Sequence, residues 1–184
     1  MMGKTHQAFA VLCLLVVERT TPEFLESSLL SVGLVMAGAL LPDLDSPESS
    51  YGRLCPWLSK PLHSVLGHRT LTHSLVMVAA IYFLSLQPGV WHFMVPPLLV
   101  GYCSHILGDL LIGSSGVGLF WPGPWRMTLN PFGLKVGGMA EYFLLHLIVI
   151  AVCALIFARS EPMLYQHLTH QLVGFLIHVS AQIS

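Results

Sequence analysis

Residues 91–112 read WHFMVPPLLVGYCSHILGDLLI, and this stretch decides the kind of fold that the chain can form. It is long and apolar enough for a helix that crosses a bilayer, which takes about 20 residues. Its exceptions are His105 and Asp109, which lie four residues apart and therefore on one face of the predicted helix. A carboxylate inside so apolar a segment is costly unless it is paired or bound. The stretch thus predicts a membrane helix that carries part of a polar site.

The composition of the whole chain also indicates a membrane environment. Hydrophobic residues make up 54% of the 184 residues and charged residues only 9%, whereas a soluble domain carries about 25% charged residues. Lys and Arg number 8 against 9 Asp and Glu, a balance that excludes a basic nucleic-acid-binding module. The length suits one domain over residues 1–184, with the lipid bilayer as its partner. A very hydrophobic soluble helical bundle is the alternative.

Five further apolar segments complete the predicted architecture. They are residues 8–17, 29–41, 74–86, 143–158 and 164–179. None shows the alternation of a strand, so we predict an all-α, polytopic membrane bundle of about five or six helices. Residues 162–184 are expected as a last span or as an interfacial helix. Two long connections, residues 42–72 and 113–138, are expected as loops of the kind that carry function.

The basic residues predict the orientation of the bundle. If the first five segments each cross once, the N-terminus and both long connections share one side of the membrane. That side carries Lys4, Arg53, Lys60, Arg69, Arg126 and Lys135, whereas the other side carries Arg19 and Arg159. Because cytoplasmic loops are enriched in Lys and Arg, we predict that the first side faces the cytoplasm of a bacterial inner membrane.

Chemically unusual residues gather on that same predicted face. The chain has 10 histidines, more than Lys and Arg together, and imidazole is the commonest metal ligand in proteins. Asp43 and Asp45 follow the second segment, and His68 and His73 precede the third. The other polar residues that fall near this face are His6, Arg69, His105, Asp109 and Glu141. Their convergence predicts a metal site toward the cytoplasmic face.

The types of ligand predict the chemistry. Imidazole and carboxylate without thiolate favour zinc, with manganese or iron(II) as alternatives, and the candidates are too many for one tetrahedral ion. Two or more ions would polarise a phosphoryl or acyl oxygen and activate water, so hydrolysis is the expected reaction class. Asp43 or Asp45 would act as base or bridging ligand, and Arg69 would bind an anionic group. A membrane-embedded site favours a lipid or amphiphilic phosphoester as substrate.

Four motifs resemble those of a known family. They are KTH at residues 4–6, LPDLDSP at 41–47, GHRTLTHS at 67–74 and GYCSHILGD at 101–109. The set is similar to that of the YdjM-like inner-membrane metal-dependent hydrolases of bacteria. That family resembles zinc phospholipase C and related nucleases, all-α enzymes that cleave phosphoesters with a cluster of metal ions. The resemblance implies as ligands His6, one of Asp43 and Asp45, His73, His105, Asp109 and Glu141.

Two other functions stay open at this point. The same ligands could form a structural or sensing metal site in a non-catalytic membrane protein, which needs no open coordination position. A metal or proton transporter would instead place paired ligands at the middle of the bilayer, whereas these residues cluster at one face. The remaining histidines are expected at the interface or in the core: His63, His92, His146, His167, His170 and His178.

Overall fold

A computed structural model describes residues 1–21, 28–113, 115–130, 133–160, 170, 171 and 173. The chain divides into two compact units, Met1–Ile148 and Val149–Ser184, and each is described by itself. All the candidate site residues belong to the first unit. The single domain expected over residues 1–184 stays a prediction, and the interfacial helix expected over residues 162–184 lies almost entirely outside the described residues.

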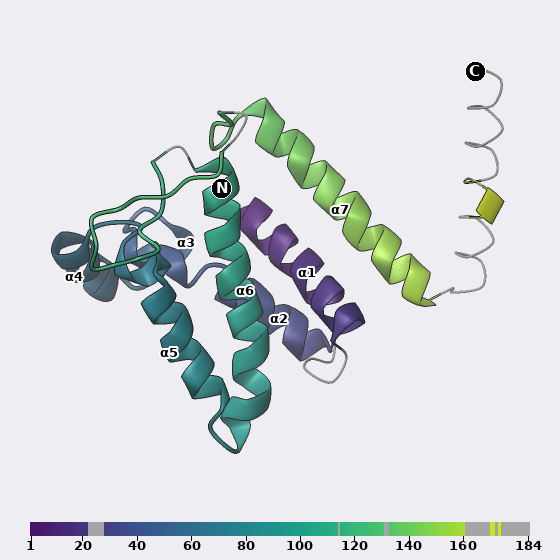
Figure 1. The fold of residues 1–184 in the computed structure, drawn as a ribbon, viewed down its shortest axis with the longest axis horizontal. Helices are drawn as coiled ribbons and strands as arrows, with labels where there is room; N and C mark the ends of the chain where they lie inside the picture. The colour runs from purple at the N-terminus through teal and green to yellow at the C-terminus, as the bar shows by residue number, and fades with distance from the viewer. Residues whose placement is uncertain (22–27, 114, 131–132, 161–169, 172, 174–184) are drawn as a thin grey trace. The chain divides into compact units, whose positions relative to one another are not determined.

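The fold of the described chain is helical (Figure 1). The α-helices are α1 (Gly3–Thr20), α2 (Leu29–Gly38), α3 (Ser50–Leu54), α4 (Pro56–Leu66), α5 (Leu75–Ser85), α6 (Val90–Ile112) and α7 (Met139–Ser160). Two short 3-10 helices are η1 (Pro42–Asp45) and η2 (Leu71–His73). The described part holds no strand, only an isolated antiparallel bridge between Val117 and Met127. The predicted all-α class is confirmed.

Two of the described helices, α6 and α7, are long and apolar enough to cross a membrane by length and composition. The 23-residue α6 is largely buried inside the first unit, as a central core helix is. The 22-residue α7 leaves most of its apolar surface exposed. Helices α2 and α5, which were expected as membrane segments, have only 10 and 11 residues, well below the roughly 20 that a span needs. Among the described residues, length and composition thus mark two candidate spans, and the polytopic bundle of five or six helices stays a prediction.

The connection over residues 42–72 is not the loop that the sequence predicts, because it folds into η1, α3, α4 and η2. The hydroxyl of Ser49 caps α3 by accepting a hydrogen bond from the Gly52 N–H at 2.9 Å. Pro56 stands in the first turn of α4, where its missing N–H costs nothing. The second connection, residues 113–138, contains no helix in its described part.

Glycine lets α2 and α6 cross with their backbones in contact. A Cβ atom on Gly101 of α6 would lie 2.0 Å from the carbonyl oxygen of Val35, and one on Gly38 would lie 2.2 Å from that of Leu98. Both distances are far inside van der Waals contact, so any larger residue would force the helices apart. Small residues allow such close crossings in membrane proteins. The crossing brings His105, one turn beyond Gly101, to the end of α2.

Candidate metal centre

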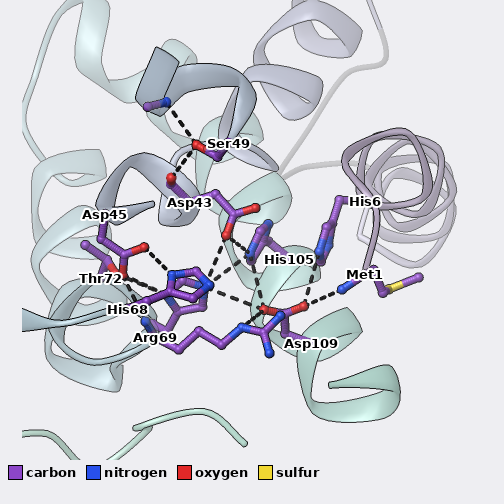
Figure 2. A network of polar contacts seen from close by, with 12 residues as sticks. Met1, His6, Asp43, Asp45, Ser49, His68, Arg69, Thr72, His105 and Asp109 are labelled. Carbon is purple, nitrogen blue, oxygen red and sulfur yellow. Dashed lines mark hydrogen bonds and ion pairs between the residues drawn. The ribbon is translucent and has the colours of Figure 1, made fainter. Parts of the chain in front are cut away.

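Four polar side chains from three segments of the first unit come together. His105 and Asp109 come from the C-terminal half of α6, Asp43 from η1 and His73 from η2. Figure 2 shows His105, Asp109 and Asp43 close together. One ligand atom from each lies within 4.8 Å of the others, a spacing that could hold a metal ion. We call these residues the four-residue group. All four were candidate ligands in the sequence, and the fold brings them together.

The distances inside the four-residue group suit a small divalent cation. The Nε2 atoms of His73 and His105 lie 3.2 Å apart. Asp43 Oδ1 lies 3.6 Å from His105 Nε2 and 3.9 Å from His73 Nε2. Asp109 Oδ2 lies 3.7 Å from both nitrogens. Zinc binds nitrogen and oxygen at about 2.0–2.2 Å, which corresponds to ligand separations of about 3.3–3.6 Å around a tetrahedron.

The hydrogen bonds around the two imidazoles leave both Nε2 atoms as acceptors. His105 Nδ1 donates to the carbonyl oxygen of Ala39 at 2.6 Å, and a carbonyl can only accept. His73 Nδ1 lies 3.0 Å from the hydroxyl of Thr72, whose own proton goes to Asp45. Burial lowers the pKa of His73, which favours the neutral ring. Two lone pairs then face each other beside two carboxylate oxygens, an arrangement that needs a cation, either a proton or a metal ion, among them.

Asp45 lies outside the four-residue group and supports it through hydrogen bonds with neighbouring residues. Its Oδ1 accepts from His68 Nδ1 at 2.6 Å, and its Oδ2 accepts from the Arg69 N–H at 3.0 Å and from the Thr72 hydroxyl. The same Oδ2 lies 3.6 Å from His73 Nδ1, so this carboxylate helps to orient the ring. Burial by itself raises the pKa of Asp45, but hydrogen bonds, that from His68 first, outweigh burial and hold the pKa well below its usual range.

Asp43 is the member of the four-residue group that reaches solvent. Its side chain is 21% exposed, whereas the other three are fully buried. Burial raises its pKa, but the nearby imidazoles, His105 first and then His73, outweigh this effect and hold the pKa below its usual range. Asp43 also belongs to a second set, with Asp45 and His68, whose ligand atoms lie within 4.8 Å of one another. A carboxylate common to both sets has the position of a bridging ligand.

Arg69 directs its guanidinium at the four-residue group and is held from several sides. Its Nε lies 2.8 Å from Asp109 Oδ2, an ion pair without the angle of a hydrogen bond, and a terminal nitrogen donates to Ser115 Oγ at 2.9 Å. Its backbone oxygen accepts from the Gly118 N–H at 2.9 Å. Among the described non-glycine residues only Arg69 has a positive φ, 61°, a conformation that costs roughly 1–3 kcal/mol. The fold therefore holds this residue in a strained conformation at the site.

His6, expected as a ligand, lies against the four-residue group but outside it. Its ring stacks on that of His105, with centroids 3.8 Å apart. Its Nε2 lies 3.3 Å from Asp109 Oδ1, again without hydrogen-bond geometry. Both ring nitrogens are buried and have no hydrogen-bond partner among the residues that the structure describes. A ligand role for His6 thus stays a prediction.

Glu141, whose role as a ligand stays a prediction, binds the N-terminal segment through hydrogen bonds. Its two oxygens accept backbone N–H groups, from Met2 at 2.5 Å and from Gly137 at 2.7 Å. The amino nitrogen of Met1 in turn lies 2.6 Å from Asp109 Oδ1. Gly108 leaves room for this segment, because a Cβ atom there would lie 2.4 Å from Met1 Sδ. Glu141 belongs to neither set of candidate ligands within the described residues.

Comparison with known sequences identifies the family. The family model described as "YdjM inner membrane protein" matches residues 1–162. The chain belongs to the YdjM family.

The alignments with individual YdjM-family relatives cover only part of each relative. The proteins named "Inner membrane protein YdjM" of Escherichia coli K12 and Shigella flexneri are each 40% identical over 111 residues, 57% of this chain and 56% of the relative. This chain therefore aligns with little more than half of these curated relatives. The "Uncharacterized protein YvsG" of Bacillus subtilis 168 is 34% identical over 116 residues, 63% of this chain and 71% of the relative. No solved structure matches, and none of these names states an enzymatic activity.

The site of this YdjM-family chain includes residues that the sequence did not single out. The Tyr102 hydroxyl donates to the backbone oxygen of Thr72 and so ties η2 to α6. Tyr102 lies three residues before His105 on the same face of α6, a spacing that could have identified it. His63, expected at the interface or in the core, donates from Nδ1 to the backbone oxygen of Asp45 at 3.0 Å. No local signal marks His63, because only the tertiary fold brings α4 to η1.

Proposed function

We propose that this chain is a multi-pass protein of the bacterial inner membrane whose metal centre hydrolyses a lipid or amphiphilic phosphoester. The description of the YdjM family supports the location. The low charge content, and exposed apolar side chains of α7 such as Phe143 and Leu147, support contact with lipid. The basic residues of the N-terminus and of the two long connections support a cytoplasmic orientation of the metal centre.

The four-residue group is the observation that carries the proposal. It combines two imidazole Nε2 atoms, whose rings donate from Nδ1, with two carboxylate oxygens inside a mostly buried site. This donor set suits zinc, with manganese or iron(II) as alternatives. A buried carboxylate such as that of Asp109 is costly unless it is paired, and a divalent ion would add to the charge that Arg69 supplies.

The residues around the group have separable tasks in this proposal. A bound divalent ion would polarise a phosphoryl oxygen and lower the pKa of bound water. His73, His105 and Asp109 would hold the ion from the buried side, and Asp43 from the side that reaches solvent. Asp43 would bridge to a second ion at Asp45 and His68. The guanidinium of Arg69 would balance the negative charge of the phosphoester.

Metal content tests the proposal directly. The protein, purified in detergent and reconstituted with zinc, should hold one or more ions per chain by elemental analysis. Asp109→Asn should lose most of that metal, because it removes the charge of a buried ligand while keeping its shape. Glu48→Gln, a matched change in the same connection as Asp43 but outside both sets, should keep it. Wild-type protein that stays free of zinc, manganese and iron after reconstitution would contradict the proposal.

A structural or sensing metal site in a non-catalytic membrane protein is the second candidate. Its support is that Arg69 already contacts Asp109 and Ser115 and is only 12% exposed, so its guanidinium is not a free anion receptor. Hydrolysis of phosphomonoester and phosphodiester lipids by the zinc-loaded protein discriminates the two. Activity that Arg69→Lys lowers at unchanged metal content favours the hydrolase. Loaded protein that cleaves none of these lipids favours the structural or sensing role.

A further inference from the structure

Helix α4 is strongly amphipathic. At about 3.6 residues per turn its side chains fall into two arcs. The apolar arc consists of Trp57, Leu58, Pro61, Leu62, Val65 and Leu66. The polar arc consists of Ser59, Lys60, His63 and Ser64. Such a division normally buries the apolar arc against the protein and leaves the polar arc in water.

Two residues of the polar arc contact the rest of the fold, and the other two, Lys60 and Ser64, are exposed. Ser59 is fully buried, and His63 donates to the backbone oxygen of Asp45 in η1. On the apolar arc Trp57 is 71% exposed and Val65 is 80% exposed. An open groove of about 260 Å³ runs along this arc, lined by Leu58, Pro61, Leu62, Val65 and Leu66. Most of the apolar arc of α4 is therefore exposed, unlike that of an amphipathic helix packed against a protein in water.

We propose that α4 lies in the bilayer interface, with its apolar arc among the upper acyl chains, and thereby holds the metal centre at the level of the lipid headgroups. The helix has 11 residues, too few to cross the bilayer, and its moment suits an orientation in the membrane plane. Tryptophan prefers the interface, which is where Trp57 would lie. Arg53 and Lys60, both exposed, flank the arc and complement anionic headgroups.

A second exposed apolar surface supports lipid as the occupant. In the connection over residues 113–138, Phe120, Trp125 and Leu129 are 52%, 66% and 55% exposed. This connection is bonded to the site, because the Gly118 N–H donates to the backbone oxygen of Arg69. Apolar surfaces on both segments next to the metal centre suit a membrane, which covers any apolar area offered to it.

The interfacial position would also define how a substrate arrives. A phosphoester in the headgroup layer would lie at the level of Asp43, the exposed member of the four-residue group. That consequence rests on the proposed hydrolase function, whereas the position of α4 in the interface does not.

Depth-dependent fluorescence quenching tests the position of α4. The full chain with Trp91, Trp121 and Trp125 changed to Phe keeps Trp57 as its one tryptophan. In bilayers of phosphatidylethanolamine and phosphatidylglycerol, lipids brominated on the upper acyl chain should quench Trp57 several-fold more strongly than aqueous iodide. The control carries Trp57→Phe and Lys60→Trp in the same background, which moves the tryptophan to the exposed middle of the polar arc and should reverse the order. Trp57 quenched mainly by iodide, or shielded from both quenchers by a second copy of the chain, would overturn the proposal.

Cysteine labelling provides a second test in the otherwise wild-type chain. Val65→Cys and Ser64→Cys place neighbouring thiols on the two arcs of α4. In intact membranes a water-soluble maleimide should label the apolar-arc thiol at least several-fold more slowly than the polar-arc thiol, above the background of the native cysteines. Equal rates would overturn the proposal. Neither test measures hydrolysis. An inactive protein would therefore contradict the proposed hydrolase function but not the interfacial position of α4.

Discussion

The imidazole ring of His6 lies flat against that of His105, with centroids 3.8 Å apart and planes inclined by 10°. Helix α1 therefore packs directly on a ring that belongs to the four-residue group. Because His6 Nε2 also lies 3.3 Å from Asp109 Oδ1, His6 touches two members of the group without joining it. The N-terminal helix is thus one wall of the centre.

Two substitutions of His6 should distinguish a packing role of this ring from a role as a metal ligand. His6→Phe keeps a flat ring on His105 and should spare the ion held by the four-residue group. His6→Ala leaves a cavity beside His105 and should lower the free energy of unfolding by about 2–4 kcal/mol. Thermal unfolding in detergent and elemental analysis check the two expectations. Complete loss of metal in a folded His6→Phe protein would instead make His6 a ligand, as the family resemblance implies.

The two aspartates of η1 should differ in their effect on metal affinity. Asp43→Asn removes a candidate ligand and should abolish tight zinc binding. Asp45→Asn weakens the support of His73 and His68 and should reduce zinc affinity by about 10–100-fold without abolishing it. Competition titration with a zinc chelator measures both. If Asp45→Asn proved the more damaging of the two, the assignment of roles would be wrong.

The close crossing of α2 and α6 gives a prediction with a matched control. Gly101→Ala places a methyl group 2.0 Å from the carbonyl oxygen of Val35 and should cost about 1–3 kcal/mol or more as the helices move apart. Gly33→Ala, in the same helix as Val35, meets nothing within 4 Å and should be neutral or stabilise by up to about 1 kcal/mol. Unfolding temperatures in one detergent compare them. Equal effects of the two changes would contradict the crossing.

Asp45 should govern the acid stability of the protein after its metal is removed with a chelator. Its pKa in the folded state lies below the unfolded value of about 3.9, so the stabilisation is complete above that value and is lost as the pH falls through the folded pKa. The stability gap between wild type and Asp45→Asn, about 1.5–3 kcal/mol at pH 7, should stay constant down to pH 5 and shrink only below pH 4. Unfolding followed from pH 7 to pH 3 measures the gap. Closure of the gap already at pH 5 would show a carboxyl with a raised pKa.

Local spacing made part of the fold and the site predictable. The segment over residues 91–112 and the observed α6 differ by one residue, because a long apolar run has few alternatives to a helix. His105 and Asp109 could be paired from the sequence, since a spacing of four residues fixes their shared face. The start of α5 follows a local rule as well, because Ser74 lies just before an apolar run and its hydroxyl accepts a hydrogen bond from the Met77 N–H.

The remaining features of the fold and the site could not be predicted, because they depend on contacts between segments that are far apart in the sequence. The sequence could not separate Asp43 from Asp45, because the difference arises from His68 and Thr72, more than 20 residues away. Helix α4 was missed because its prolines and serines are typical of loops. The sequence predicted that Glu141 lies at the end of the bundle that carries the site. It could not predict that the hydrogen-bond donors to Glu141 are the backbone N–H groups of Met2 and Gly137. Every residue except proline carries a backbone N–H, so no residue type in the sequence marks these donors.

The dispersal of the four-residue group along the chain has a consequence for biogenesis. Asp43 and His73 are synthesised well before His105 and Asp109, which complete the set near the end of α6. A nascent chain that has inserted only as far as α5 therefore holds half of the centre and cannot retain an ion there. If the centre binds a metal ion as proposed, capture of the ion would be a late step of insertion, because metal binding is coupled to folding.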